Sequence, residues 1–189
     1  MLKFHEAVQE RPGMYLGATD RLAGVRLVGI VIDTMVRLTA RLETPLLFPG
    51  HAFLDVGIIG RDVDILLDFS ATECPDILDR CEHLVGLFES TFEHVGSDTL
   101  ATWETDFFIA KDLAKNLCIS RSSRDQVFPI IGTPMTNHPD TTKDACLRAT
   151  FHIKDQIDLN GLTDDYLRGF VQGSDHARGL VLRQTTVST

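Results

Sequence analysis

The sequence predicts an α+β fold, a two-layer sandwich in which helices pack on a mostly antiparallel mixed sheet. Apolar residues recur at helical spacing in several separate segments, whereas the strand patterns come in hairpins and meanders. Strict strand–helix–strand alternation, which would favour a parallel sheet, is absent. With 189 residues, 43% of them hydrophobic and 24% charged, the chain can fill one core and is short for two. We therefore expect a single domain over residues 1–189.

The first long element is a helix that Thr19 or Asp20 can cap and that runs to about Leu42. Apolar residues surround it on most sides, which predicts deep burial. The remaining elements are expected in this order: a hairpin of Ala52–Ile59 and Val63–Phe69 about the turn Gly60-Arg61-Asp62, a helix beginning near Pro75, a helix Glu104–Leu117, strands Leu117–Arg121 and Gln126–Ile131 joined by the turn Ser122–Asp125, a loop Gly132–Asp144, an alternating strand Leu147–Ile153, a helix Thr163–Gln172 and a strand Gly179–Val187.

Charge and cysteine content restrict the function classes. The formal net charge is −9, which argues against direct nucleic-acid binding, because that affinity comes from Lys and Arg neutralising phosphates. The four cysteines are scattered without a CxxC pair, and no apolar run is long enough to span a bilayer. We expect reduced thiols, a cytoplasmic protein with no membrane contact, and no cofactor. Cys81, Glu82, His83 and His94 are metal-ligand types. Their spacing gives no pair on one helical face with a third ligand nearby, so we expect surface residues and no metal site.

One motif is specific. Arg11–Gly17 reads RPGMYLG, and Glu6-Ala7-Val8 precedes it. This segment resembles the "EAVRKRPGMYIG" opening of the ATPase domain of DNA gyrase B and topoisomerase IV, which has the GHKL (Bergerat, Hsp90-like) fold. The order of expected elements also matches that domain over nearly the whole chain. The resemblance implies a gyrase-B-like fold.

The same resemblance implies that the ATPase chemistry is lost. The family's general-base glutamate falls at Ile30, and its magnesium-binding asparagine falls at Thr34. The adenine-binding aspartate falls at Asp68, with Phe69 as the rival register. The family's phosphate-binding glycines are missing from Val95–Trp103, where only Gly96 remains. A hydrocarbon at position 30 cannot accept a proton. We therefore expect neither ATPase nor topoisomerase activity.

The candidate site follows from these positions. The candidate catalytic residues are Asp33, Thr34 and Asp68, and the candidate ligand-binding residues are Ile30, Phe69, Trp103, Ile131 and Thr150. Two readings of Asp33 stay open: a structural carboxylate paired with an N–H group or with an arginine such as Arg11, or a desolvated pocket acid. Trp103 can equally cap a pocket or pack in the core.

Two hypotheses for function follow. In the first, the former ATP pocket of a non-hydrolysing gyrase-B-like protein takes a hydrophobic or weakly polar small molecule. It would act by binding or by ATP-independent catalysis in specialised metabolism. In the second, the chain is a pseudo-ATPase interaction module whose protein partner is gyrase, as in self-protection against an inhibitor, or a toxin.

Overall fold

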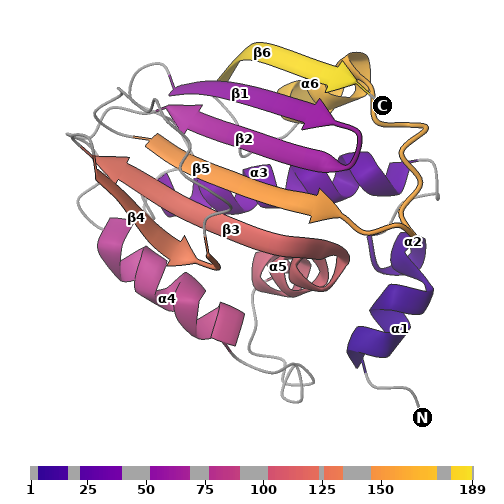
Figure 1. Cartoon of the computed structure of the whole chain (residues 1–189), viewed down its shortest axis with the longest axis horizontal. Coiled ribbons are helices and arrows are strands. Elements are labelled where there is room, and N and C mark those ends of the chain that lie inside the picture. Colours follow the sequence, from indigo (N-terminus) through magenta and orange to yellow (C-terminus); the bar gives the residue numbers. More distant parts are fainter. Residues whose placement is uncertain are drawn as a thin grey trace.

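The computed structural model describes residues 4–16, 22–39, 52–68, 77–89, 102–123, 126–133, 146–173 and 180–188. Within these ranges it has a mixed, mostly antiparallel sheet covered on one face by helices, which confirms the α+β prediction (Figure 1). The strands are β1 (Ala52–Ile59), β2 (Asp62–Asp68), β3 (Ala114–Ser123), β4 (Gln126–Ile131), β5 (Cys146–Ile153) and β6 (Leu180–Ser188). The helices are α1 (Phe4–Glu10), α2 (Pro12–Tyr15), α3 (Ala23–Thr39), α4 (Ile77–Glu89), α5 (Thr102–Leu113) and α6 (Asp164–Gly173).

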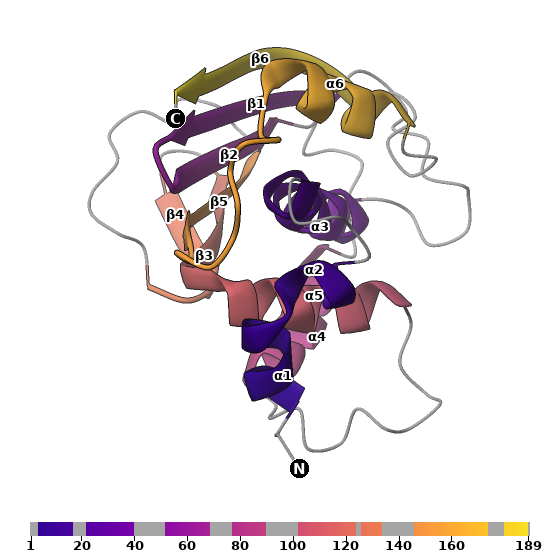
Figure 2. The same cartoon turned by 90° about the vertical axis from the view of Figure 1, so that its right-hand side faces the viewer.

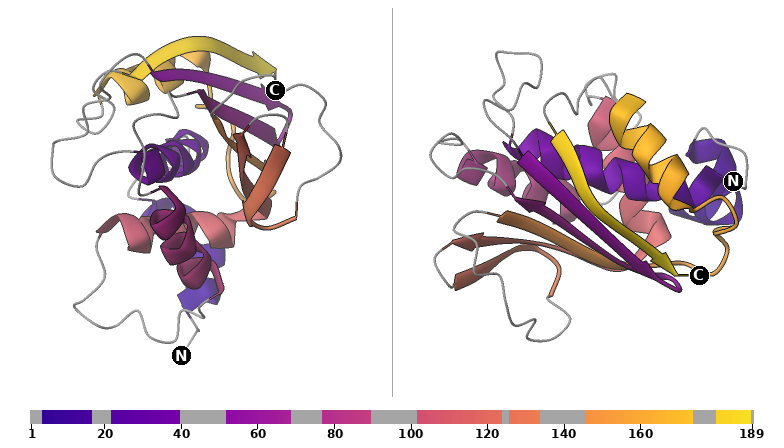
Figure 3. Two further views of the ribbon diagram at one scale, coloured as in Figure 1. Left: turned by 90° about the vertical axis from the view of Figure 1, so that its left-hand side faces the viewer. Right: turned by 90° about the horizontal axis from the view of Figure 1, so that it is seen from above.

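The six-stranded sheet has the order β4-β3-β5-β2-β1-β6. The pairing of β1 with β6 is parallel, and every other neighbouring pair is antiparallel. The sheet curves around α3, which lies against its inner face with α5 beside it (Figure 2). Helix α6 packs on both α3 and β6, so the helical layer reaches one edge of the sheet (Figure 3).

Strand alternation explains how this layer is held. On β2, the side chains of Val63, Ile65 and Leu67 are buried in the core with the helices, and the residues between them face the other way. Helix α3 is buried on most sides, as its apolar composition predicts. Near its start, a Cβ at Gly24 would lie 3.2 Å from the backbone oxygen of Asp158, so glycine lets the helix approach the segment that follows β5 closely.

The β1–β2 hairpin is confirmed. Gly60 has φ +58 at the turn, a conformation that glycine adopts without strain. The guanidinium of the next residue, Arg61, donates to the backbone carbonyl groups of Lys154, Asp155 and Ile157 at 2.8, 3.1 and 3.1 Å. This turn therefore fixes the segment that follows β5 against the sheet.

The expected helix Glu104–Leu117 was too long. Helix α5 ends at Leu113, and β3 starts at once because Ala114 pairs with Ile153 of β5. A bulge with Asn116 at φ +56 follows before regular pairing resumes. Strand β3 also extends to Ser123, into the expected turn. The expected caps Thr19 and Asp20, the helix end near Leu42, the helix start at Pro75 and most of the Gly132–Asp144 loop lie outside the described residues.

No helix in the described ranges is both long enough and apolar enough to cross a membrane.

Candidate functional site

One face of α3 is less buried than the rest. Arg26, Ile30, Asp33 and Arg37 follow each other at intervals of three or four residues and so lie on one side of the helix. Asp106 of α5 feels the charges of Asp33, Arg26 and Arg37, so this face of α3 is turned toward α5. We call these five residues the α3–α5 seam.

Asp33 is held by an arginine from its own helix. The Arg37 Nε donates to the Asp33 Oδ2 at 2.7 Å, and the side chains of Arg37 and Asp33 are 27% and 24% exposed. The arginine partner that the sequence allowed is thus present, but it is Arg37 rather than Arg11. The carboxylate of Asp33 is therefore already engaged by a charge-assisted hydrogen bond within its own helix.

Asp106 is partly buried and lies near a second carboxylate, that of Asp33. Burial raises the pKa of its carboxyl, and the nearby negative charge of Asp33 raises it further, while Arg26 and Arg37 oppose both effects. The seam therefore combines two carboxylates and two guanidinium groups around one aliphatic side chain, Ile30. Asp106 was not among the predicted site residues. Its helical spacing of three from Trp103 is the one local signal that could have found it.

The two positions expected to replace the family's ATPase residues differ in exposure. Ile30 is half-buried and packs against the core. Thr34 is 2% exposed, and its hydroxyl donates to the backbone oxygen of Ile30 at 2.9 Å. This bond back to the preceding turn engages the Thr34 proton within the helix. Ile30 is accordingly the better placed of the two to contact a ligand in the seam.

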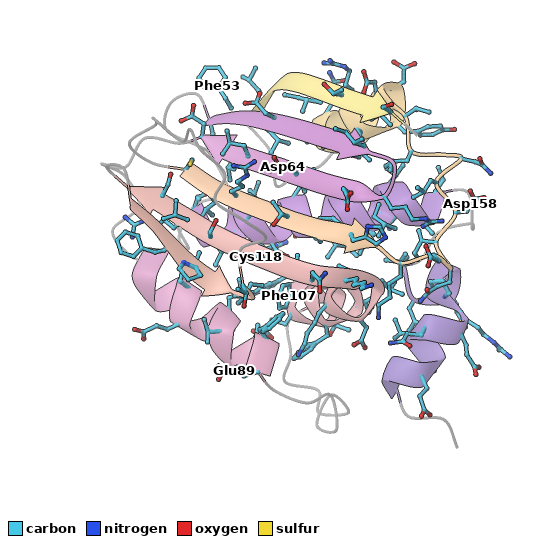
Figure 4. The ribbon with its side chains drawn as sticks, viewed as in Figure 1. Phe53, Asp64, Glu89, Phe107, Cys118 and Asp158 are labelled. Carbon is cyan, nitrogen blue, oxygen red and sulfur yellow. The ribbon has the colours of Figure 1, made fainter. Side chains whose placement is uncertain are left out.

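Asp68 and Thr150 are not brought together with α3. Strand alternation puts Asp68 on the face of β2 opposite the helices, whereas the core-facing neighbour Leu67 is fully buried. Asp64 lies on that same outer face (Figure 4), and Thr150 is its partner in the strand register. Two guanidinium nitrogens of Arg148 donate to the two carboxylate oxygens of Asp64. A ligand between the helices and the sheet would therefore contact Leu67 rather than Asp68.

The other predicted ligand contacts are dispersed. Ile131 of β4 is buried opposite Ile119 of β3 and belongs to the core. Trp103 is half-buried at the start of α5 and also packs against the core. Phe69 lies outside the described residues. The structure thus gathers Ile30, Asp33 and Thr34 on α3, near α5.

A polar pair next to Trp103 was missed by the sequence reasoning. The ring of His83 on α4 lies 6.0 Å from the Trp103 ring, and its Nε2 is 2.7 Å from the Glu104 Oε1. Glu104 was expected only as the start of a helix, and His83 was expected as an unremarkable surface residue. No local pattern signals a contact between residues this far apart in sequence. It depends on how α4 packs on α5.

The described cysteines are thiols buried in the fold. Cys81, Cys118 and Cys146 are all free, and burial raises the pKa of each thiol. Cys81 is only 8% exposed, so the expectation that it lies at the surface was wrong: it is on the core-facing side of α4. Among the described residues, no group of three or more His, Cys, Asp or Glu side chains could hold a metal ion.

The chain was compared with known families, curated proteins and solved structures. No family model and no curated protein matches the chain. The crystal structure of the DNA gyrase B-subunit from Myxococcus xanthus is similar over 82% of this chain, with 16% sequence identity and a TM-score of 0.48. The matched region spans 44% of the gyrase chain.

Proposed function

We propose that this protein binds a hydrophobic or weakly polar small molecule at the α3–α5 seam and does not hydrolyse ATP. The observation that carries the proposal is Ile30, an aliphatic side chain left half-buried between charged neighbours on the side of α3 turned toward α5. The N-terminal motif resembles that of gyrase B, and in that family this helix position holds the general base. An isoleucine cannot take the proton, but it can contact an apolar ligand.

The charges around α5 support a ligand without phosphates. The first turns of a helix normally attract anions, because unpaired N–H groups and the helix dipole favour negative charge there. In α5 that region carries two acidic residues, Glu104, which is 11% exposed, and Asp106. A triphosphate approaching these carboxylates would meet repulsion. A neutral molecule would not.

The hydrogen bonds already made by polar residues of α3 support binding as the basic activity. Arg37 already holds Asp33, and Thr34 already bonds to its own helix. These polar groups therefore add little to ligand binding, and the affinity for the ligand comes mainly from apolar area buried around Ile30. Any catalysis at the seam would be ATP-independent and would use positioning with few polar groups.

Thermal melting tests the proposal. A ligand at one hundred times its dissociation constant stabilises the native state by about 2.7 kcal/mol. We expect compounds from a lipophilic metabolite panel to raise the Tm, and magnesium with a non-hydrolysable ATP analogue to leave it unchanged. Stabilisation by the ATP analogue would refute the proposal.

A matched pair of variants locates the site. Ile30→Glu should abolish the ligand-induced rise in Tm, because it places a charge where the apolar contact forms. Ile59→Glu makes the same chemical change at a side chain that is 70% exposed on the outer face of the sheet, and it should leave the rise intact. Equal ligand stabilisation of both variants would place the ligand elsewhere.

A protein-interaction role is the second candidate, and one observation favours it. Val127 and Phe128 are adjacent on the edge strand β4 and are 51% and 50% exposed. Exposed apolar residues on a sheet edge are typical of partner-binding surfaces. Sedimentation of the chain with purified DNA gyrase tests this role. Complex formation that Phe128→Glu abolishes would support it, and independent sedimentation of the two proteins would exclude gyrase as the partner.

A further inference from the structure

His83 and Glu104 form a dyad between two helices. The carboxylate of Glu104 is only 11% exposed, whereas the imidazole of His83 is 55% exposed. A carboxylate can only accept a hydrogen bond, so the 2.7 Å contact requires the proton on the His83 Nε2. In the neutral imidazole, the other ring nitrogen, Nδ1, then carries the lone pair.

The helices that carry the dyad are held together at a second point. The ammonium group of Lys111 on α5 donates to the backbone oxygen of Phe88 on α4 and lies 4.8 Å from the centre of the Phe88 ring. Burial lowers the pKa of this lysine. The contact ties the end of α4 to α5 and so limits relative motion of His83 and Glu104. Their geometry is therefore set before any ligand arrives.

The indole of Trp103 completes the arrangement. Its ring is tilted by 58° to the imidazole ring, with the ring centres 6.0 Å apart. Trp103 precedes Glu104 in sequence, so the aromatic surface and the carboxylate are carried by the same turn of α5. A flat apolar surface beside an oriented imidazole is suited to an aromatic or acyl group next to a reacting bond.

We propose that His83 is a general base that activates water against an ester-type substrate lying beside Trp103, and that Glu104 is its positioning residue. The inference goes beyond the proposed function, because the site lies where α4 meets α5, beside Trp103, and not at the α3–α5 seam. It adds a reaction class, the hydrolysis of activated acyl bonds. The role of Glu104 is to fix the imidazole tautomer and to stabilise the imidazolium that forms.

The reaction step balances without a cofactor. As the oxygen of a water molecule forms a bond to the ester carbonyl carbon, one proton of that water moves to the His83 Nδ1. The tetrahedral intermediate then collapses, and the bond between the carbonyl carbon and the leaving oxygen breaks. The leaving group departs with the electron pair. The imidazolium returns its proton to solvent or to the leaving oxygen.

p-Nitrophenyl acetate is the probe, with release of p-nitrophenolate followed by absorbance. General-base catalysis typically contributes ~10²–10⁴-fold, so we expect His83→Gln to lower kcat/KM by about 10²-fold. Glu104→Gln keeps a hydrogen-bonding group but removes the charge, and it should lower kcat by about 10-fold with KM unchanged. The wild-type rate should also fall in D2O, because a proton moves in the rate-limiting step.

The chain offers a matched control. His152 on β5 pairs through Nδ1 with Asp62 at 2.9 Å, but that carboxylate is 70% exposed on the outer face of the sheet. His152→Gln should leave the rate unchanged. Equal loss in the two histidine variants, or no loss in His83→Gln at an unchanged Tm, would overturn the inference. If His83→Gln keeps full activity while lipophilic ligands still raise the Tm, the dyad fails and the proposed binding function stands.

Discussion

Replacement of Gly132 by alanine should destabilise the fold strongly. Gly132 follows β4 with φ +69, and a Cβ there would lie 2.3 Å from the backbone oxygen of Leu117 and 3.1 Å from the Cα of Cys118. Both neighbours are backbone atoms of β3, so no flexible side chain can move aside. The β3–β4 pair would have to separate at this point.

The expected loss in free energy of unfolding for Gly132→Ala has two contributions. A left-handed backbone costs an alanine about 1–2 kcal/mol. Separating the strands disrupts ladder hydrogen bonds, each with a net worth of about 1 kcal/mol. Together they give about 3–4 kcal/mol for Gly132→Ala, or a fall in Tm on the order of 10 °C for a chain of this length. Urea and thermal unfolding followed by circular dichroism measure both quantities.

Two other glycines separate the contributions. Gly60 also has a positive φ, +58, but a Cβ added there would meet nothing within 4 Å, so Gly60→Ala should cost only the backbone strain of about 1–2 kcal/mol. Gly86 lies within α4 with open space around it, and Gly86→Ala should stabilise by about 0.5–1 kcal/mol. If Gly132→Ala costs no more than Gly60→Ala, the close contact with β3 is refuted.

Three further predictions concern separate parts of the structure. Arg61→Met removes the charged donor to the segment after β5 and should destabilise by about 1.5–3 kcal/mol in urea unfolding; an unchanged midpoint would contradict that anchoring role. Asp106→Asn should raise the Tm at pH 7. Because burial and Asp33 raise the pKa of this carboxyl, its protonated form favours folding below the unfolded pKa of about 3.9, and that contribution is lost as pH rises through the folded pKa. The rise in Tm caused by Asp106→Asn should therefore vanish in melts near pH 3. An equal rise at pH 3 and pH 7 would refute the raised pKa of Asp106. Leu67→Ala should cost about 2–5 kcal/mol and Leu66→Ala clearly less, because only Leu67 faces the helices; equal losses would contradict the register of β2.

Much of the fold was predictable because its signals are local. The β1–β2 hairpin needed only a glycine turn between two β-rich runs, and its bounds agree with the prediction within a residue or two. The alternating residues of β5 predicted which of its side chains are buried. In the candidate site, Ile30 and Thr34 were selected from the resemblance to gyrase B, and the predicted helix already placed both on one element with Asp33.

The amino-acid sequence by itself determined the order and type of the elements from α3 onward, apart from the start of β3, and the buried character of α3. Each of these depends on residues within a few positions of each other. Tertiary structure alone decided where α5 ends and β3 begins. Ala114 and Lys115 were expected in the helix, but they pair with β5 and belong to the strand. The pairing of Arg37 with Asp33 is, by contrast, a local contact between residues four positions apart on one helix. Contacts across long stretches of chain, such as that of His83 with Glu104, form only when separate elements pack, so no local pattern encodes them.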